Sequence, residues 1–124
     1  MTNGKACRGF TLIELLVVLA IVATLTALAA PRYITQVERG RETVLKHNLR
    51  SLREALDQYV HDRGQPPSEL EALVTAQYLR DVPLDPVTAR RDTWEVERGP
   101  MGQVVDVRSG APGKATDGTA YSEW

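Results

Sequence analysis

Residues 8–30 read RGFTLIELLVVLAIVATLTALAA, and this stretch decides the fold. Phe10 to Ala30 is an apolar run long enough to cross a bilayer as a helix, at about 1.5 Å per residue against about 30 Å of hydrocarbon. Glu14 is the one charged residue in this run. Because a carboxylate inside a membrane span costs about 2.5 kcal/mol or more, we infer that Glu14 has a function.

The rest of the chain is small and ordinary in composition. The protein has 124 residues, a net charge of -1, 43% hydrophobic and 25% charged residues. About 95 residues remain outside the leader and the apolar run, which is enough for one small core. The single cysteine, Cys7, precedes the run, so no disulfide can form within the chain. Nothing in the overall charge indicates nucleic-acid binding.

A secretory signal peptide is one interpretation of the N-terminus. Lys5 and Arg8 form a basic leader, and Ala27-Leu28-Ala29 offers an A-x-A cleavage site. The apolar run is, however, longer than the usual core of about 7–15 residues, and it contains Glu14. These features favour a retained membrane anchor.

The residues Gly9-Phe10-Thr11-Leu12-Ile13-Glu14 resemble the cleavage signal of type IV pilins and type II secretion pseudopilins. That signal is a basic leader ending in glycine, followed by Phe-Thr-Leu-x-Glu. The resemblance implies that a prepilin peptidase cuts between Gly9 and Phe10 and that Phe10 is then N-methylated. It also implies a single-pass protein of the bacterial inner membrane, with a cytoplasmic leader, a periplasmic C-terminal domain and a helix used for polymerisation.

The position of Glu14 suits an assembly role. Cleavage would create a cationic amine on Phe10, one helical turn before Glu14. In a staggered fibre the carboxylate of one subunit could meet the amine of the next, which would offset the desolvation of both charges. We therefore predict that Glu14 is an assembly contact.

The helix is expected to continue from Phe10 through Pro31 to about Arg63, where Gly64 supplies a C-cap. Pro31 and Gly40 are predicted kink positions, as a static bend or as a site of local melting on assembly. Beyond Pro31 an apolar stripe recurs at steps of three and four residues, apart from a gap at Gly40 and Arg41: Ile34, Val37, Val44, Leu45, Leu49, Leu52, Leu56, Tyr59 and Val60.

Charged residues of both signs fill the other face of this helix. Glu42/Lys46, Arg50/Glu54 and Arg53/Asp57 stand four residues apart, a spacing that allows ion pairs on a helix surface. The interleaved charges favour a solvated face over a nucleic-acid interface.

The C-terminal residues predict a small α/β subdomain. Ser68 to Glu71 has the capping-box form, with Ser68 as N-cap of a short helix over residues 69–76. Residues 93–98 and 103–108 read as strands joined by a turn at 99–102. We expect Tyr121 and Trp124 to pin the tail to this sheet. The fold class is thus α+β and pilin-like: residues 1–9 as a cleaved leader, 10–30 as the membrane and polymerisation helix, 31–63 as its amphipathic half, and 64–124 as the subdomain.

This layout, with its Leu84-Asp85-Pro86 loop and Ser-Gly-x-Pro-Gly tail, is similar to the major pseudopilin group of type II secretion. In that group a calcium ion orders the last loop, so the resemblance makes calcium a candidate ligand here, at Asp117, Ser109 and Asp106. The group's clustered tail acids are mostly missing from this chain, and a loop held by hydrogen bonds and by Trp124 is the alternative.

No motif for catalysis is present in the sequence, and Ser109 fits a turn better than a nucleophile. The resemblance implies a non-enzyme that is a substrate of the prepilin peptidase and methyltransferase. Expected partners are further copies in a fibre, other pseudopilins and an inner-membrane assembly platform. The main hypothesis is a type II secretion subunit, and the second is a type IV pilin or minor pilin for adhesion, motility or DNA uptake. A third is a secreted enzyme or binding protein cut after Ala29.

Overall fold

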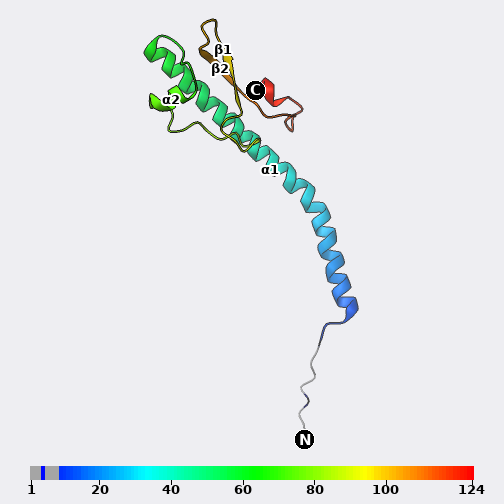
Figure 1. Ribbon diagram of the computed structural model, residues 1–124. Helices are drawn as coiled ribbons and strands as arrows, with labels where there is room; N and C mark the ends of the chain where they lie inside the picture. Colours follow the sequence, from blue (N-terminus) through cyan, green and yellow to red (C-terminus); the bar gives the residue numbers. More distant parts are fainter. Residues whose placement is uncertain (1–3, 5–8) are drawn as a thin grey trace. The chain divides into compact units, whose positions relative to one another are not determined.

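The computed structural model describes residue 4 and residues 9–124. By its contacts within the structure, the chain divides into two units, Met1–Gln36 and Val37–Trp124. Within the described residues the elements are α1 (Leu12–Arg63), α2 (Glu71–Thr75), β1 (Trp94–Arg98), β2 (Val104–Ser109) and a short 3₁₀ helix, η1 (Tyr121–Glu123), as Figure 1 shows. The predicted α+β fold, with a long N-terminal helix, a short helix and an antiparallel hairpin, is confirmed.

The end of α1 lies where the sequence predicts it. The helix stops at Arg63, and Gly64 follows with a φ of 76°, a left-handed conformation that glycine adopts without a Cβ clash. The amide of Gly64 donates to the carbonyl of Val60 at 2.8 Å, which satisfies one of the last carbonyls of the helix. The start of α1 is two residues later than predicted, at Leu12.

One face of α1 forms half of the hydrophobic core. Leu45, Leu49, Leu52 and Leu56 follow each other at steps of four and three residues, and each is at most 4% exposed. They pack against residues of α2, of the loop between α2 and β1, and of the β1–β2 hairpin. These segments lie beside the second half of α1 in Figure 1. The core partners are Leu70, Leu73, Val82, Trp94, Val104 and Val107. The buried stripe is shorter than predicted, because Ile34, Val37, Val44 and Val60 are exposed.

The predicted capping box before α2 is wrong. The helix covers Glu71–Thr75, its N-cap is Leu70, and no side chain caps it. Arg98 of β1 explains the difference, because its guanidinium donates to the carbonyl of Ser68 at 3.0 Å and pairs with the carboxylate of Glu69 at 3.1 Å. The segment before α2 is therefore held by the hairpin.

The hairpin forms as predicted, with one irregularity. β1 and β2 are antiparallel, Trp94 pairs with Ser109, and the register shifts between Glu97 and Arg98. The turn closes through a bond from the amide of Gly99 to the carbonyl of Gln103 at 2.8 Å. β2 extends to Ser109, one residue beyond the prediction.

The loop between α2 and β1 is fastened from three sides. Asn48 of α1 donates to the carbonyl of Leu84 at 2.7 Å, and the indole of Trp94 donates to the carbonyl of Pro83 at 2.7 Å. The carboxylate of Asp85 is fully buried and accepts from the Ser109 hydroxyl at 2.6 Å. It also accepts from two backbone amides of its own turn. A buried carboxylate with these donors fixes the loop to the end of β2.

Candidate functional site

The candidate site begins where α1 begins. The amide of Glu14 donates to the Thr11 hydroxyl at 3.2 Å, and the amide of Leu15 donates to the Thr11 carbonyl at 3.2 Å. Thr11 is thus the N-cap, and Glu14 is the third helical residue, where a carboxylate interacts favourably with the helix N-terminus. Thr-x-x-Glu is a capping-box sequence, so the residues carry a signal for this N-cap, whereas the predicted capping box is the one at Ser68.

The predicted cleavage position lies just ahead of this cap. Gly9 and Phe10 are outside the helix, and the Phe10 side chain is 92% exposed. A Cβ placed on Gly9 would meet no other atom within 4 Å. Both residues of this junction are therefore exposed among the described residues. The basic residues of the predicted leader, Lys5 and Arg8, lie outside the described residues, as does Cys7.

The first half of α1, after the cap, is apolar and has no partner among the described residues. α1 contains a window with a mean hydropathy of 2.6, none of which is buried against other parts of the described chain. By length and composition, it is the one helix of the described part that could cross a membrane. Phe10, Ile13, Glu14, Val17 and Val18 line a shallow hollow of about 370 Å³ on its surface. Among described residues, the Glu14 carboxylate accepts no hydrogen bond and forms no ion pair.

Pro31 and Gly40 both lie inside α1, which continues through them. The hydroxyl of Thr35 donates to the carbonyl of Pro31 at 3.1 Å, a bond along the same helix. Neither predicted kink is tested by these contacts, and both stay predictions.

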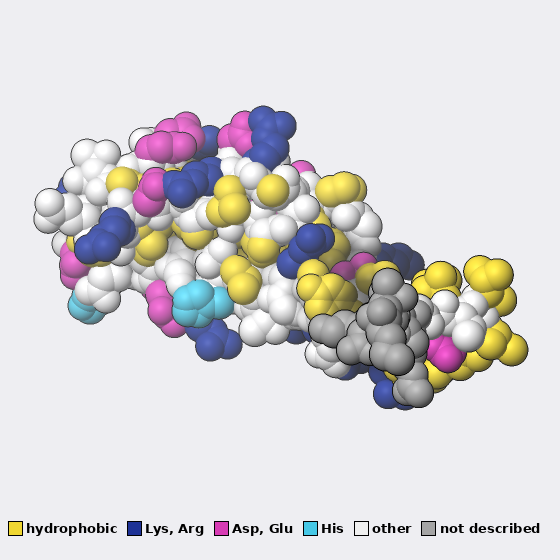
Figure 2. All heavy atoms as spheres, turned by 90° about the horizontal axis from the view of Figure 1, so that it is seen from below, with side chains coloured by type: hydrophobic (Ala, Val, Ile, Leu, Met, Phe, Trp, Pro, Cys, Tyr) yellow, Lys and Arg dark blue, Asp and Glu magenta, His cyan; other side chains and the backbone are white. Residues whose placement is uncertain are grey.

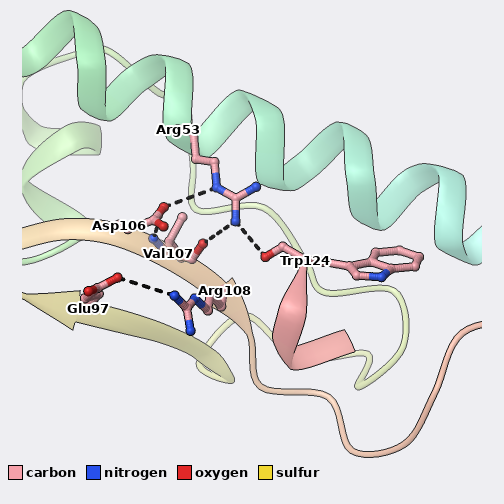
Figure 3. Close-up of polar contacts among 6 residues, drawn as sticks. All are labelled: Arg53, Glu97, Asp106, Val107, Arg108 and Trp124. Carbon is pink, nitrogen blue, oxygen red and sulfur yellow. Dashed lines mark hydrogen bonds and ion pairs between the residues drawn. The ribbon is translucent and has the colours of Figure 1, made fainter. Parts of the chain in front are cut away.

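A second group of polar residues holds the segment after β2. Arg53 donates to the Asp106 carboxylate at 3.2 Å and to the backbone oxygens of Val107 and Trp124 at 3.0 and 2.7 Å (Figure 3). Glu42 is 8% exposed and accepts from the amide and the hydroxyl of Thr116 at 2.6 and 2.7 Å. The prediction that Glu42 and Arg53 form pairs four residues apart on a solvated face is therefore wrong.

The tail aromatics do pin the tail, as predicted. Tyr121 and Trp124 pack against the core, and their rings meet edge to face at 5.3 Å. The Trp124 indole donates to the Thr119 hydroxyl at 2.7 Å. Burial of the Tyr121 hydroxyl and the negative charge of Glu42 raise the pKa of Tyr121.

Elsewhere on the globular unit, Figure 2 shows basic and acidic side chains interspersed over one face.

The three residues considered for calcium have separate partners. The Asp106 carboxylate accepts from Arg53, the Asp117 carboxylate accepts from the hydroxyl and amide of Thr119, and the buried Ser109 hydroxyl bonds to Asp85. Calcium requires about six to eight oxygen ligands around one point. The described residues contain no group of three or more His, Cys, Asp or Glu side chains placed to hold a metal ion. As arranged here, these residues do not fit a calcium site.

The Ser109 hydroxyl has a structural contact. It is fully buried, donates to Asp85 and accepts from the amide of Ala111 at 3.1 Å. Its bonds connect β2 to the loop and to the tail. This arrangement explains Ser109 as a fold contact.

Comparisons with known proteins agree with the N-terminal motif. A family profile described as the prokaryotic N-terminal methylation motif matches residues 4–30. The chain is 35% identical over 94 residues to type II secretion system core protein G of Pseudomonas aeruginosa, covering 63% of this chain and 66% of that protein. It is 28% identical over 123 residues to fimbrial protein EcpC of Eikenella corrodens, covering 90% of this chain and 78% of the relative.

Some of these matches are partial. The chain spans just under two thirds of the Pseudomonas protein. No solved structure matches the chain. A longer match is type II secretion system core protein G of Klebsiella michiganensis, 30% identical over 122 residues, with 86% of this chain and 84% of that protein covered. Together with the capped apolar helix and the small α/β unit, this match shows that the chain belongs to the type II secretion system core protein G family, the pseudopilins.

Proposed function

We propose that this protein is a structural subunit of a type II secretion pseudopilus, which supports protein export across the outer membrane. The observation that carries the proposal is α1 itself. Its first half presents apolar side chains that nothing in the described chain covers, and Glu14 lies one turn after Phe10. A membrane, and later neighbouring subunits, would bury this surface.

Processing prepares the assembly contact. Cleavage between the exposed Gly9 and Phe10 would leave the Phe10 amine, which is then methylated, ahead of the Thr11 cap. This amine would pair with the Glu14 carboxylate of an adjacent copy as both leave water or lipid headgroups. An unpaired Glu14 in the apolar environment would be costly, so the pair would select the docked register.

The proposed partners follow from this mechanism. They are further copies of the chain, other pseudopilins, the prepilin peptidase with its methyltransferase, and an inner-membrane assembly platform driven by a cytoplasmic ATPase. The protein would be a substrate of the processing enzymes and not itself an enzyme. Before assembly it would be a single-pass inner-membrane protein with a cytoplasmic N-terminus and a periplasmic globular unit.

Two measurements test the proposal. N-terminal mass spectrometry of the mature protein should find methylated Phe10 as the first residue, whereas Ala30 as the first residue would show a cleaved secretory signal instead. Deleting the gene should then abolish the release of exoproteins, and re-expression should restore it. Unchanged exoprotein release in the deletion strain would contradict the secretion assignment.

A second candidate function is a type IV pilin or minor pilin, whose fibre leaves the cell. The match to a fimbrial protein over 90% of this chain favours it. The same deletion strain separates the two functions. Loss of surface fibres with normal exoprotein release would favour the pilin.

A further inference from the structure

Three charged residues of α1 lie on one helical face and contact the segment after β2. Glu42, Lys46 and Arg53 are separated by four and seven residues, which are about one and two helical turns. We call them the α1 clamp. Each reaches a partner far away in sequence, and together they contact the beginning, the middle and the end of residues 106–124.

Arg53 forms three of the hydrogen bonds of the clamp. One guanidinium donates to the Asp106 carboxylate, the Val107 carbonyl and the Trp124 carbonyl, so it bridges β2 and the residue that follows η1 (Figure 3). The side chains of Arg53 and Asp106 are 38% and 37% exposed, so water screens this pair only in part. A planar guanidinium with several fixed donors suits this triple contact.

Lys46 and Glu42 complete the clamp towards the start of the globular unit. The Lys46 ammonium lies 4.5 Å from the centroid of the Trp124 ring, a cation–π distance. Glu42 accepts both the amide and the hydroxyl of Thr116, and it lies 3.5 Å from the Tyr121 hydroxyl. The clamp thus supplies two cations and one buried acceptor to the tail.

We propose that the α1 clamp orders the C-terminal segment in place of a bound metal ion, so that the folded tail is independent of calcium. Arg53 places a fixed positive charge beside Asp106, where a second cation would be repelled. The Asp117 Oδ1 atom already accepts two bonds from Thr119, one from its amide and one from its hydroxyl. The two carboxylates that a metal ion would use are therefore already bonded to other side chains of the chain.

The first test uses the full chain in detergent micelles and compares calcium chloride with EGTA. We expect the wild-type Tm to be the same in both, and calorimetry to show no heat of calcium binding. A Tm that rises with calcium and falls with EGTA would overturn the proposal. This arm needs no variant, so it stands even if a substituted protein fails to fold.

The second test replaces Arg53, one of the two cations of the clamp, with an apolar side chain of similar length. Arg53→Met should lower the Tm by about 5 °C and speed amide exchange of residues 113–121, with no rescue by calcium. Arg50→Met is the matched control, because Arg50 is exposed and forms no hydrogen bond with the described residues. It should leave both measurements unchanged. Equal tail exchange in Arg53→Met and the wild type would overturn the role of the clamp.

Discussion

The two halves of α1 differ in where their side chains find partners. From Leu12 to Ile34 the large apolar side chains are at least half exposed in the isolated chain. From Glu42 to Leu56 the same helix buries a leucine stripe and a carboxylate against the globular unit. A continuous helix therefore carries two surfaces, one completed within the chain and one that needs a membrane or other subunits.

This difference separates folding from assembly. Substitutions in the second half should change the free energy of unfolding of the globular unit, because their contacts lie within it. Substitutions in the first half should leave that free energy unchanged and act on membrane insertion or fibre formation. The predictions below test this separation, from the largest expected effect to the smallest.

A leucine from each half gives the largest contrast. Leu52 is fully buried, so Leu52→Ala should lower the free energy of unfolding by about 3 kcal/mol through lost burial and a residual cavity. Leu19 is 57% exposed, so Leu19→Ala should change it by less than about 0.5 kcal/mol. Denaturant unfolding of the full chain in micelles, followed by tryptophan fluorescence, measures both. Equal losses would show that the two halves fold as one unit.

Two glycines provide a second contrast within the globular unit. A Cβ at Gly40 would meet no atom within 4 Å, so Gly40→Ala should stabilise the helix by about 1 kcal/mol. A Cβ at Gly110 would clash with the backbone carbonyl oxygen of Thr93, so Gly110→Ala should destabilise the hairpin. The same unfolding assay measures both signs. If Gly40 is a hinge used in assembly, Gly40→Ala should also reduce fibre yield, and normal yield would remove that role.

Low pH should loosen the tail by a small amount. Bonds from the side chain and backbone of Thr119 hold the pKa of Asp117 below its usual range. Because the pKa of Asp117 is lower in the folded state, its ionised carboxylate adds to the folding stability at pH values above the unfolded pKa of about 3.9. This contribution is lost as the pH falls through the folded pKa. Hydrogen exchange of residues 115–121 should therefore lose protection at and below about pH 4. Asp117→Asn should show a weaker pH dependence, and identical profiles would contradict the assignment.

Local sequence signals predicted the elements well. The end of α1 at Arg63, the hairpin turn and the packing of Tyr121 and Trp124 all follow from caps, alternation and aromatic content. The Thr11 cap has an equally clear local signal, Thr-x-x-Glu, although it is not among the elements predicted from the sequence.

Contacts between distant residues could not be predicted in the same way. Arg53 forms hydrogen bonds across sequence separations of 53, 54 and 71 positions. Glu42 accepts a bond from Thr116 across a separation of 74 positions. The spacing of charges along one helix predicts partners four residues away. It carries no information on which residues of another strand or loop will pack against that helix. The false capping box at Ser68 has the same cause, because Arg98 reaches that segment from β1.

The central claim is that Glu14 is satisfied by another subunit, and one substitution tests it directly. Glu14→Ala should still be cleaved and methylated at Phe10, with a wild-type Tm for the globular unit, because the carboxylate forms no hydrogen bond or ion pair with the described residues. Fibres recovered by shearing and pelleting should fall at least about tenfold, the size expected for the loss of roughly 1.4 kcal/mol or more per contact. Normal processing with a wild-type yield of fibres would contradict the claim.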